Sequence, residues 1–182
     1  MSRWLSDLSA SVSDFERAVK PQLMKVLDAD KIESIESHTS KEMKNILDEN
    51  AGIDLWVVHK DGTIRGLASR VQWGHNFKTF TIRKSRETGA ETEYEKRKRS
   101  IDNDALYPHY TCHSYFDTKE GDLLGFAVCK TVDLFDAIDN GYFRVNRTTN
   151  ADFYIIKWDD VDTIDVQQLT LDALIEEAIR IH

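Results

Sequence analysis

The sequence lacks the features that would place it in a membrane or divide it into domains. Its 182 residues contain no apolar run near the roughly 18 that span a bilayer. The first ten residues lack the basic and then apolar order of a signal peptide. With two prolines, eight glycines and no repetitive tract, no linker is visible. We therefore expect a single domain over residues 1–182, located in the cytoplasm.

Cysteine is also scarce. Cys112 and Cys129 each lie within an apolar segment of the kind that forms a buried strand. No His and acid accompany either thiol in a recognisable nucleophile motif, so we expect buried, reduced cysteines. The glycine patterns of nucleotide-binding loops and of the serine-hydrolase elbow are absent too, which removes those common functions.

Negative charge exceeds positive charge, with a net charge of −8. This balance excludes a protein that coats nucleic acid with its whole surface, because phosphate binding needs concentrated Lys and Arg. Residues 78–99 differ, since eight Lys and Arg against four Glu give them a net +4 and leave −12 for the remainder. We expect one cationic face on an otherwise acidic molecule.

Hydrophobic periodicity predicts interspersed helices and strands. Helical spacing marks residues 15–27 (undivided or split at Pro21), 39–50, 92–103, 132–138 and 169–181. Strand patterns mark residues 53–58, 64–73, 77–82, 107–116, 123–130 and 153–158. Asp61-Gly62 is the hairpin signal between the first two strands. This order favours an α/β (α+β) fold with a mixed central sheet flanked by helices.

Polar residues on the predicted hairpin form a candidate site. Asp54 begins one strand, and Arg70 and Gln72 lie two residues apart on the next, where they share a face. Carboxylate and carbonyl oxygens are the ligands that Mg²⁺ prefers, and Mg²⁺ can activate water and stabilise a transferring phosphoryl group. An Asp at a strand start can equally be a turn or cap residue, and a Gln can simply face water.

The hairpin resembles the PD-(D/E)XK nuclease superfamily, which has the restriction-endonuclease and Holliday-junction-resolvase fold. Gly52-Ile53-Asp54 is similar to the family's strand that begins with a metal-binding Asp, and Arg70-Val71-Gln72 falls where the family has Glu/Asp-X-Lys. The third motif is degenerate, because Arg70 stands in the carboxylate position and Gln72 in the usual Lys position. The resemblance covers about residues 34–86 by motif and the rest by element order alone.

The resemblance implies a catalytic site in which Asp54 binds Mg²⁺ or Mn²⁺ and Gln72 positions water or metal. A Glu from the preceding segment would complete the site, and the candidates are Glu36, Glu42 and Glu49.

Basic residues follow the hairpin closely. Phosphate contacts from them would hold a nucleic-acid backbone near Asp54, and the candidates are Arg70, Lys78, Arg83, Lys84 and Arg86. The run Lys96-Arg97-Lys98-Arg99 would point around most of a helix, so we interpret it as a solvated face paired with nearby glutamates. Nearby aromatic residues either stack on bases or, for most of them, pack in the core: Trp56, Trp73, Phe77 and Phe80.

Three functions remain open. The resemblance implies a metal-dependent DNA endonuclease of a phage or of a bacterial defence or counter-defence system, dimeric because two DNA strands need two sites. Arg70 in the acid position motivates a catalytically inactive nucleic-acid-binding module of the same fold. The acidic remainder motivates an inhibitor that binds a protein partner through its acidic surface.

Overall fold

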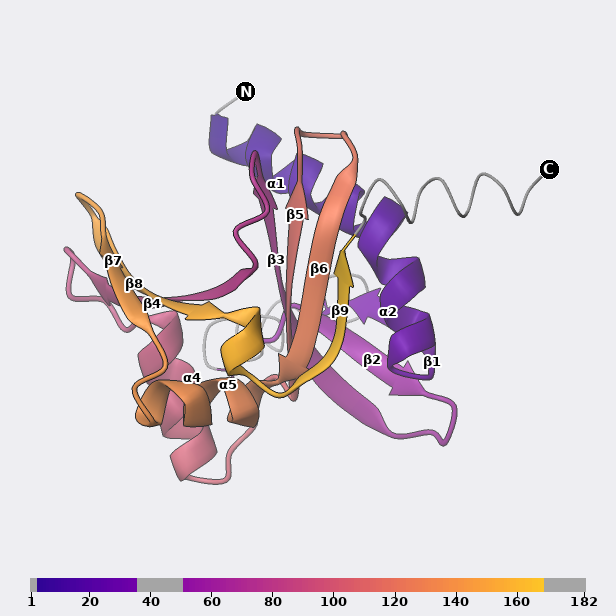
Figure 1. Cartoon of the computed structure of the whole chain (residues 1–182). Helices are drawn as coiled ribbons and strands as arrows, with labels where there is room; N and C mark the ends of the chain where they lie inside the picture. Colours follow the sequence, from indigo (N-terminus) through magenta and orange to yellow (C-terminus); the bar gives the residue numbers. More distant parts are fainter. Residues whose placement is uncertain (1–2, 36–50, 169–182) are drawn as a thin grey trace.

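The computed structural model describes residues 3–35 and 51–168 (Figure 1). The helices are α1 (Arg3–Asp14), the π-helical η1 (Phe15–Val19), α2 (Lys20–Val26), α4 (Glu93–Asp102), α5 (Thr131–Asp139) and the 3-10 helix η4 (Trp158–Asp160). The strands are β1 (Ala29–Ser34), β2 (Leu55–His59), β3 (Ile64–Trp73), β4 (Thr79–Arg86), β5 (Tyr110–Phe116), β6 (Leu123–Lys130), β7 (Arg144–Arg147), β8 (Ala151–Lys157) and β9 (Thr163–Gln168). Within these residues, no helix is both long enough and apolar enough to cross a membrane.

The described strands form two sheets. The larger has six strands in the order β1-β2-β3-β5-β6-β9, with β3 and β5 parallel and the other neighbours antiparallel. The smaller is antiparallel, in the order β4-β8-β7. The predicted α/β class with a mixed sheet is confirmed. The smaller sheet was not predicted, because periodicity identifies a strand without identifying its partner.

Apolar side chains bury both faces of the larger sheet. On one face, Phe15 and Leu23 of the N-terminal helices share a cluster with Cys112. On the other face, Phe135 of α5 shares a second cluster with Cys129. Figure 1 shows α1 and α2 on one side of the larger sheet, and α4, α5 and the smaller sheet on the other. Both cysteines are buried and free, as predicted.

Elements with a strong local signal have nearly the predicted bounds. β3 and β6 match the predicted strands, and Gly62 closes the hairpin with a φ of +83°. Thr92 begins α4 with a capping box, because its side chain accepts the N–H of Glu95 while the Glu95 carboxylate accepts the N–H of Thr92. The helices predicted at 39–50 and 169–181 lie outside the described residues.

Three strands escaped prediction because their sequences are short and polar. β1 (ADKIES), β7 (RVNR) and β9 (TIDVQQ) contain few apolar residues, so neither alternation nor an apolar run marks them. The N-terminal helix also begins earlier than predicted, at Arg3, and a π-helical turn precedes Pro21.

The chain leaves the larger sheet after β3 at a glycine. Gly74 has a φ of +109°, and its N–H donates to the carbonyls of Phe116 and Asp117 at the end of β5. β4 then passes over β5, where the N–H of Thr81 donates to Nδ1 of His113 at 3.1 Å. This crossing brings charged residues of β4 above the centre of the larger sheet.

A buried carboxylate fastens the N-terminal helices to the sheet. Asp14 has no solvent exposure, and its Oδ2 accepts Nε1–H of Trp73 at 2.9 Å and the N–H of Glu120 at 3.1 Å. Its Oδ1 accepts from Arg17 at 2.9 Å. A buried carboxylate with three donors is stabilising as long as every donor keeps its partner.

We predict that Asp14→Ala lowers the free energy of unfolding by about 3 kcal/mol, because it leaves the partly buried indole N–H of Trp73 and the N–H of Glu120 without their acceptor. Urea-induced unfolding at neutral pH measures this. The matched control is Asp7→Ala, which removes an exposed ion pair with Lys119 and should cost less than about 1 kcal/mol. Equal costs for the two variants would contradict the assigned role of Asp14.

Candidate functional site

A polar cavity of about 240 Å³ is lined by residues of β3, β4, β5 and α4 and by the segment before β2. Its acidic lining residues are Asp54 and Glu93, and its basic ones are Arg70, Arg83, Arg86, Lys96 and Arg97. Five cations against two carboxylates give this lining a net +3, although the whole chain carries −8. We call this site the cationic cavity.

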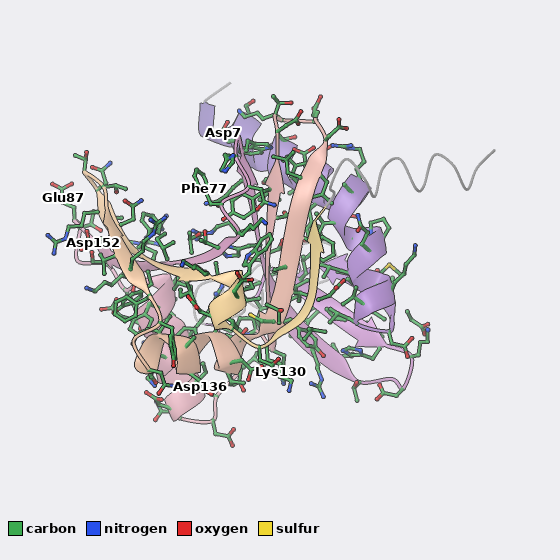
Figure 2. All side chains as sticks on the ribbon, in the orientation of Figure 1. Asp7, Phe77, Glu87, Lys130, Asp136 and Asp152 are labelled. Carbon is green, nitrogen blue, oxygen red and sulfur yellow. The ribbon has the colours of Figure 1, made fainter. Side chains whose placement is uncertain are left out.

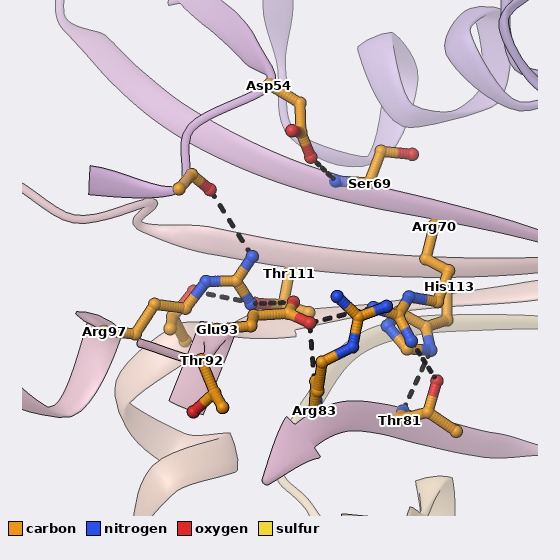
Figure 3. A network of polar contacts seen from close by, with 12 residues as sticks. Asp54, Ser69, Arg70, Thr81, Arg83, Thr92, Glu93, Arg97, Thr111 and His113 are labelled. Atoms are coloured by element: carbon orange, nitrogen blue, oxygen red, sulfur yellow. Dashed lines mark hydrogen bonds and ion pairs between the residues drawn. The ribbon is translucent and has the colours of Figure 1, made fainter. Parts of the chain in front are cut away.

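Glu93 joins two of these cations. Its Oε2 lies 2.8 Å from Nη2 of Arg70, and its Oε1 lies 2.9 Å from Nη1 of Arg97 (Figure 3). Burial alone would raise the pKa of Glu93, but the charges of Arg97 and Arg70 outweigh burial and lower the pKa to about 2. Its place in the first turn of α4 also favours a negative charge. Glu93 is therefore ionised and held by two guanidinium groups.

Among the described residues, the remaining cations of the cavity have no carboxylate partner in an ion pair. In residues 3–35 and 51–168, no ion pair joins an acid to Arg83, Arg86 or Lys96. Burial, followed by the like charges of Arg86 and Arg70, lowers the pKa of Arg83. Nε of Arg97, whose residue is only 4% exposed, has no hydrogen-bond partner in the same part of the chain. An anion in the cavity would relieve the repulsion and accept from such donors.

Asp54 lies where the ladder between β2 and β3 ends. The two strands pair from Leu55 and Leu67 outward to the hairpin. Beyond that pair, the N–H of Asp54 donates to the carbonyl of Leu67 at 3.0 Å, and Oδ2 of Asp54 accepts the N–H of Ser69 at 2.8 Å (Figure 3). The side chain thus replaces a strand partner for β3. The side chain of Asp54 is exposed.

The structure brings together some of the predicted site residues. Arg70, Arg83 and Arg86 line the cationic cavity with Asp54. Gln72 lines a neighbouring cavity, so the structure does not place its amide beside Asp54. The catalytic role of Gln72 stays a prediction.

Other predicted residues lie elsewhere. Lys78 and Lys84 are not part of the lining, and Nζ of Lys84 lies 5.4 Å from the centre of the Tyr154 ring. Glu36, Glu42 and Glu49 fall outside the described residues.

Several lining residues were missed from sequence. The prediction of a solvated face at residues 96–99 is wrong for Arg97, which is buried against Glu93, and Lys96 lines the cavity beside it. The signal that could have found this pair is the i,i+4 spacing of Glu93 and Arg97 on a capped helix. His113 could not have been found this way, because its place in the site depends on β4 crossing β5.

A metal ion in the cationic cavity would need ligands besides the two carboxylates of its lining. No group of three or more His, Cys, Asp or Glu side chains suited to a metal occurs in the part of the chain that the structure describes. Asp54 can supply one oxygen ligand, whereas both oxygens of Glu93 are engaged by guanidinium groups. Among the residues that line the cavity, no second carboxylate is therefore open to a metal ion.

Comparisons of the chain with protein-family models, with curated proteins and with solved structures find no match. The resemblance to PD-(D/E)XK nucleases accordingly stays a prediction from the motif residues.

His113 forms a neutral floor for this charged site. Its Nδ1 accepts the N–H of Thr81, which is possible only for a neutral ring with the proton on Nε2. Burial and the charge of Arg70 lower the pKa of His113 to about 3. The unfolded chain takes up this proton near pH 6.5, so the stability that His113 contributes is complete above pH 6.5 and falls as the pH drops toward 3.

We predict that the free energy of unfolding falls by about 1 kcal/mol per pH unit between pH 6.5 and 4.5 through His113 alone. Glu93 adds its own loss only as the pH falls from 4.5 toward 2, because its pKa is lowered on folding. Urea unfolding across this range tests the slope. In His113→Gln the slope between pH 6.5 and 4.5 should flatten, whereas the exposed-residue control His75→Gln should keep it. An unchanged slope in His113→Gln would rule out this assignment.

Proposed function

We propose that the cationic cavity binds the phosphodiester backbone of DNA, and that the chain cleaves this backbone as a metal-dependent endonuclease of the PD-(D/E)XK type. One observation carries the proposal: the Asp54 carboxylate opens into the same cavity as five cationic side chains. Phosphodiester hydrolysis needs both elements, since cations hold the phosphate and a carboxylate holds the metal.

Charge supports the phosphate-binding half of the proposal. Arg83, Arg86 and Lys96 have no carboxylate partner among the described residues, so their charge is available to a ligand. Guanidinium groups bind phosphate oxygens in a bidentate way, which fixes the position of the backbone as well as its affinity. The acidic remainder of the chain would repel DNA elsewhere and direct it to this face.

Asp54 supports the hydrolytic half. Asp54 would hold Mg²⁺ or Mn²⁺ together with Glu36, Glu42 or Glu49, and the metal would supply Lewis acidity and an activated water. Arg83 and Arg86 would hold the phosphate against this side of the cavity. Gln72 would act on water or on the substrate from the neighbouring cavity. A homodimer would present two such sites to the two strands of a duplex.

A second candidate function is DNA binding without cleavage. The observation that favours it is the ion pair of Arg70 with Glu93, since a guanidinium group stands where the family has a carboxylate. The other acid of the cavity is thereby committed to Arg70 and Arg97. The buried, free cysteines suit the reducing cytoplasm in either case.

We predict that the protein cleaves plasmid or single-stranded DNA with Mg²⁺ or Mn²⁺ and not with EDTA. Asp54→Asn should lower the cleavage rate at least about 100-fold, because the amide keeps an acceptor for the Ser69 N–H but loses the charge that holds the metal. Gel assays measure the rate, and thermal melting checks that the variant stays folded. The control Asp61→Asn, in the hairpin turn, should cleave normally. DNA binding without cleavage by the unmodified protein would favour the second candidate.

We also predict that the double variant Arg83→Ala with Lys96→Ala binds DNA about tenfold or more weakly at low salt. The slope of log affinity against log salt should fall by about one for each lost phosphate contact. Fluorescence anisotropy of a labelled oligonucleotide, in EDTA to prevent cleavage, measures both quantities. Lys130→Ala serves as the control, because Lys130 is exposed at the end of β6 and is not part of the cavity lining. Equal losses in the two variants would mean that binding is not centred on the cavity.

A further inference from the structure

A second cavity, of about 560 Å³, lies beside the cationic cavity. Arg70 of β3 lines the first and Gln72 lines the second, so the two cavities follow one face of the same strand. On β4, Arg83 likewise lines the first cavity, and Thr79 and Thr81 line the second. A hydrogen bond of 3.1 Å from Nη1 of Arg70, which lines the first cavity, to Oγ1 of Thr81, which lines the second, connects the two linings.

The second cavity has different chemistry. Phe77, which is 61% exposed, lines it, and Figure 2 shows this residue between the two sheets. Val145 and Ile155 of the smaller sheet add apolar wall. Gln72 and Asn146 also line it, and neither side-chain amide makes a hydrogen bond to another side chain in residues 3–35 and 51–168. Thr79, Thr81 and the cationic Arg144 line it as well, so the cavity combines an apolar wall with polar groups, as small-ligand sites do.

We infer that the second cavity receives an unpaired base of the same DNA strand whose phosphate occupies the cationic cavity. This inference rests on the proposed function. Side-chain amides offer a donor and an acceptor together, which is the pattern that base edges require. An exposed aromatic ring provides a stacking surface for the flat face of a base. Continuity with a phosphate site is what distinguishes a nucleotide from other ligands that contain a flat ring.

The geometry also defines the form of the DNA. Gln72 follows Arg70 by one same-face step of about 7 Å along β3, so a base beside Gln72 belongs to a nucleotide at or next to the bound phosphate. A base inside a duplex is stacked and paired and cannot enter such a pocket unless it is extruded. The substrate class is therefore single-stranded DNA, or duplex DNA with a locally unpaired base.

The test compares three labelled ligands by fluorescence anisotropy in EDTA: a short single-stranded oligonucleotide, its abasic counterpart with tetrahydrofuran units in place of every base, and its perfect duplex. The base-bearing strand should bind about tenfold or more tightly than the abasic strand, and more tightly than the duplex. Phe77→Ala should remove most of this advantage and leave abasic binding unchanged. In a further series of homopolymeric strands, each with one kind of base, Gln72→Ala should alter the order of their affinities. Tyr142→Ala is the matched control, since Tyr142 is 57% exposed and is not part of either lining.

The outcomes separate this inference from the function on which it rests. Equal binding of the base-bearing and abasic strands by the unmodified protein would overturn the base site and leave phosphate binding intact. The same conclusion follows if Phe77→Ala changes nothing, or if the duplex binds most tightly. Failure of all three ligands to bind would overturn the proposed function itself. Since Phe77 is exposed, its replacement should not unfold the chain, and thermal melting verifies this.

Discussion

The site depends on one carboxylate held between two guanidinium groups. Glu93 reaches Arg70 on β3 and Arg97 one turn further along its own helix, so a single side chain fastens α4 to the larger sheet. Removing one partner from a largely buried ion pair typically costs about 3–5 kcal/mol, because the other charge stays buried without compensation. Without Glu93, Arg70 and Arg97 would also repel each other. This contact helps to hold α4, and with it Lys96, beside the cavity.

That contact also determines the charge that a ligand meets. One negative charge shared by two cations leaves an excess of one positive charge. Arg83, Arg86 and Lys96 add three more and Asp54 removes one, which gives the lining its net +3. The neutral His113 contributes no charge, and it holds β4 in place through the N–H of Thr81. The cavity thus keeps a positive potential inside an acidic chain, where it is screened less than an exposed patch would be.

Local signals predicted the elements but not their partners. β3 (Ile64–Trp73) has the bounds predicted for it, because a hairpin-turn signal and strand-forming residues both occur there. The strand predicted at residues 77–82 overlaps β4 (Thr79–Arg86) only in part. The pairing of β4 with β8 depends on the turn at Gly74 and on contacts remote in sequence. Asp54 and Arg70 line the same cavity, as their spacing suggested. Gln72, two residues further along β3, lines the second cavity instead. Arg97 was assigned to solvent because four consecutive basic residues resemble an exposed helix, and only the fold provides Glu93 with two cations to join.

The arrangement of the acids makes the two halves of the proposed function, phosphate binding and hydrolysis, depend on different residues. Arg70 occupies the position where the resemblance implies a carboxylate, and Glu93 returns an acid to the cavity from α4. Glu93 cannot act as a metal ligand unless Arg70 or Arg97 gives up a short ion pair, because both of its oxygens are engaged. Phosphate binding needs no such rearrangement, since Arg83, Arg86 and Lys96 already lack acidic partners in the described part of the chain. In the proposed function, hydrolysis would therefore take a metal ligand from Glu36, Glu42 or Glu49, whereas phosphate binding would use residues already assembled around the cavity.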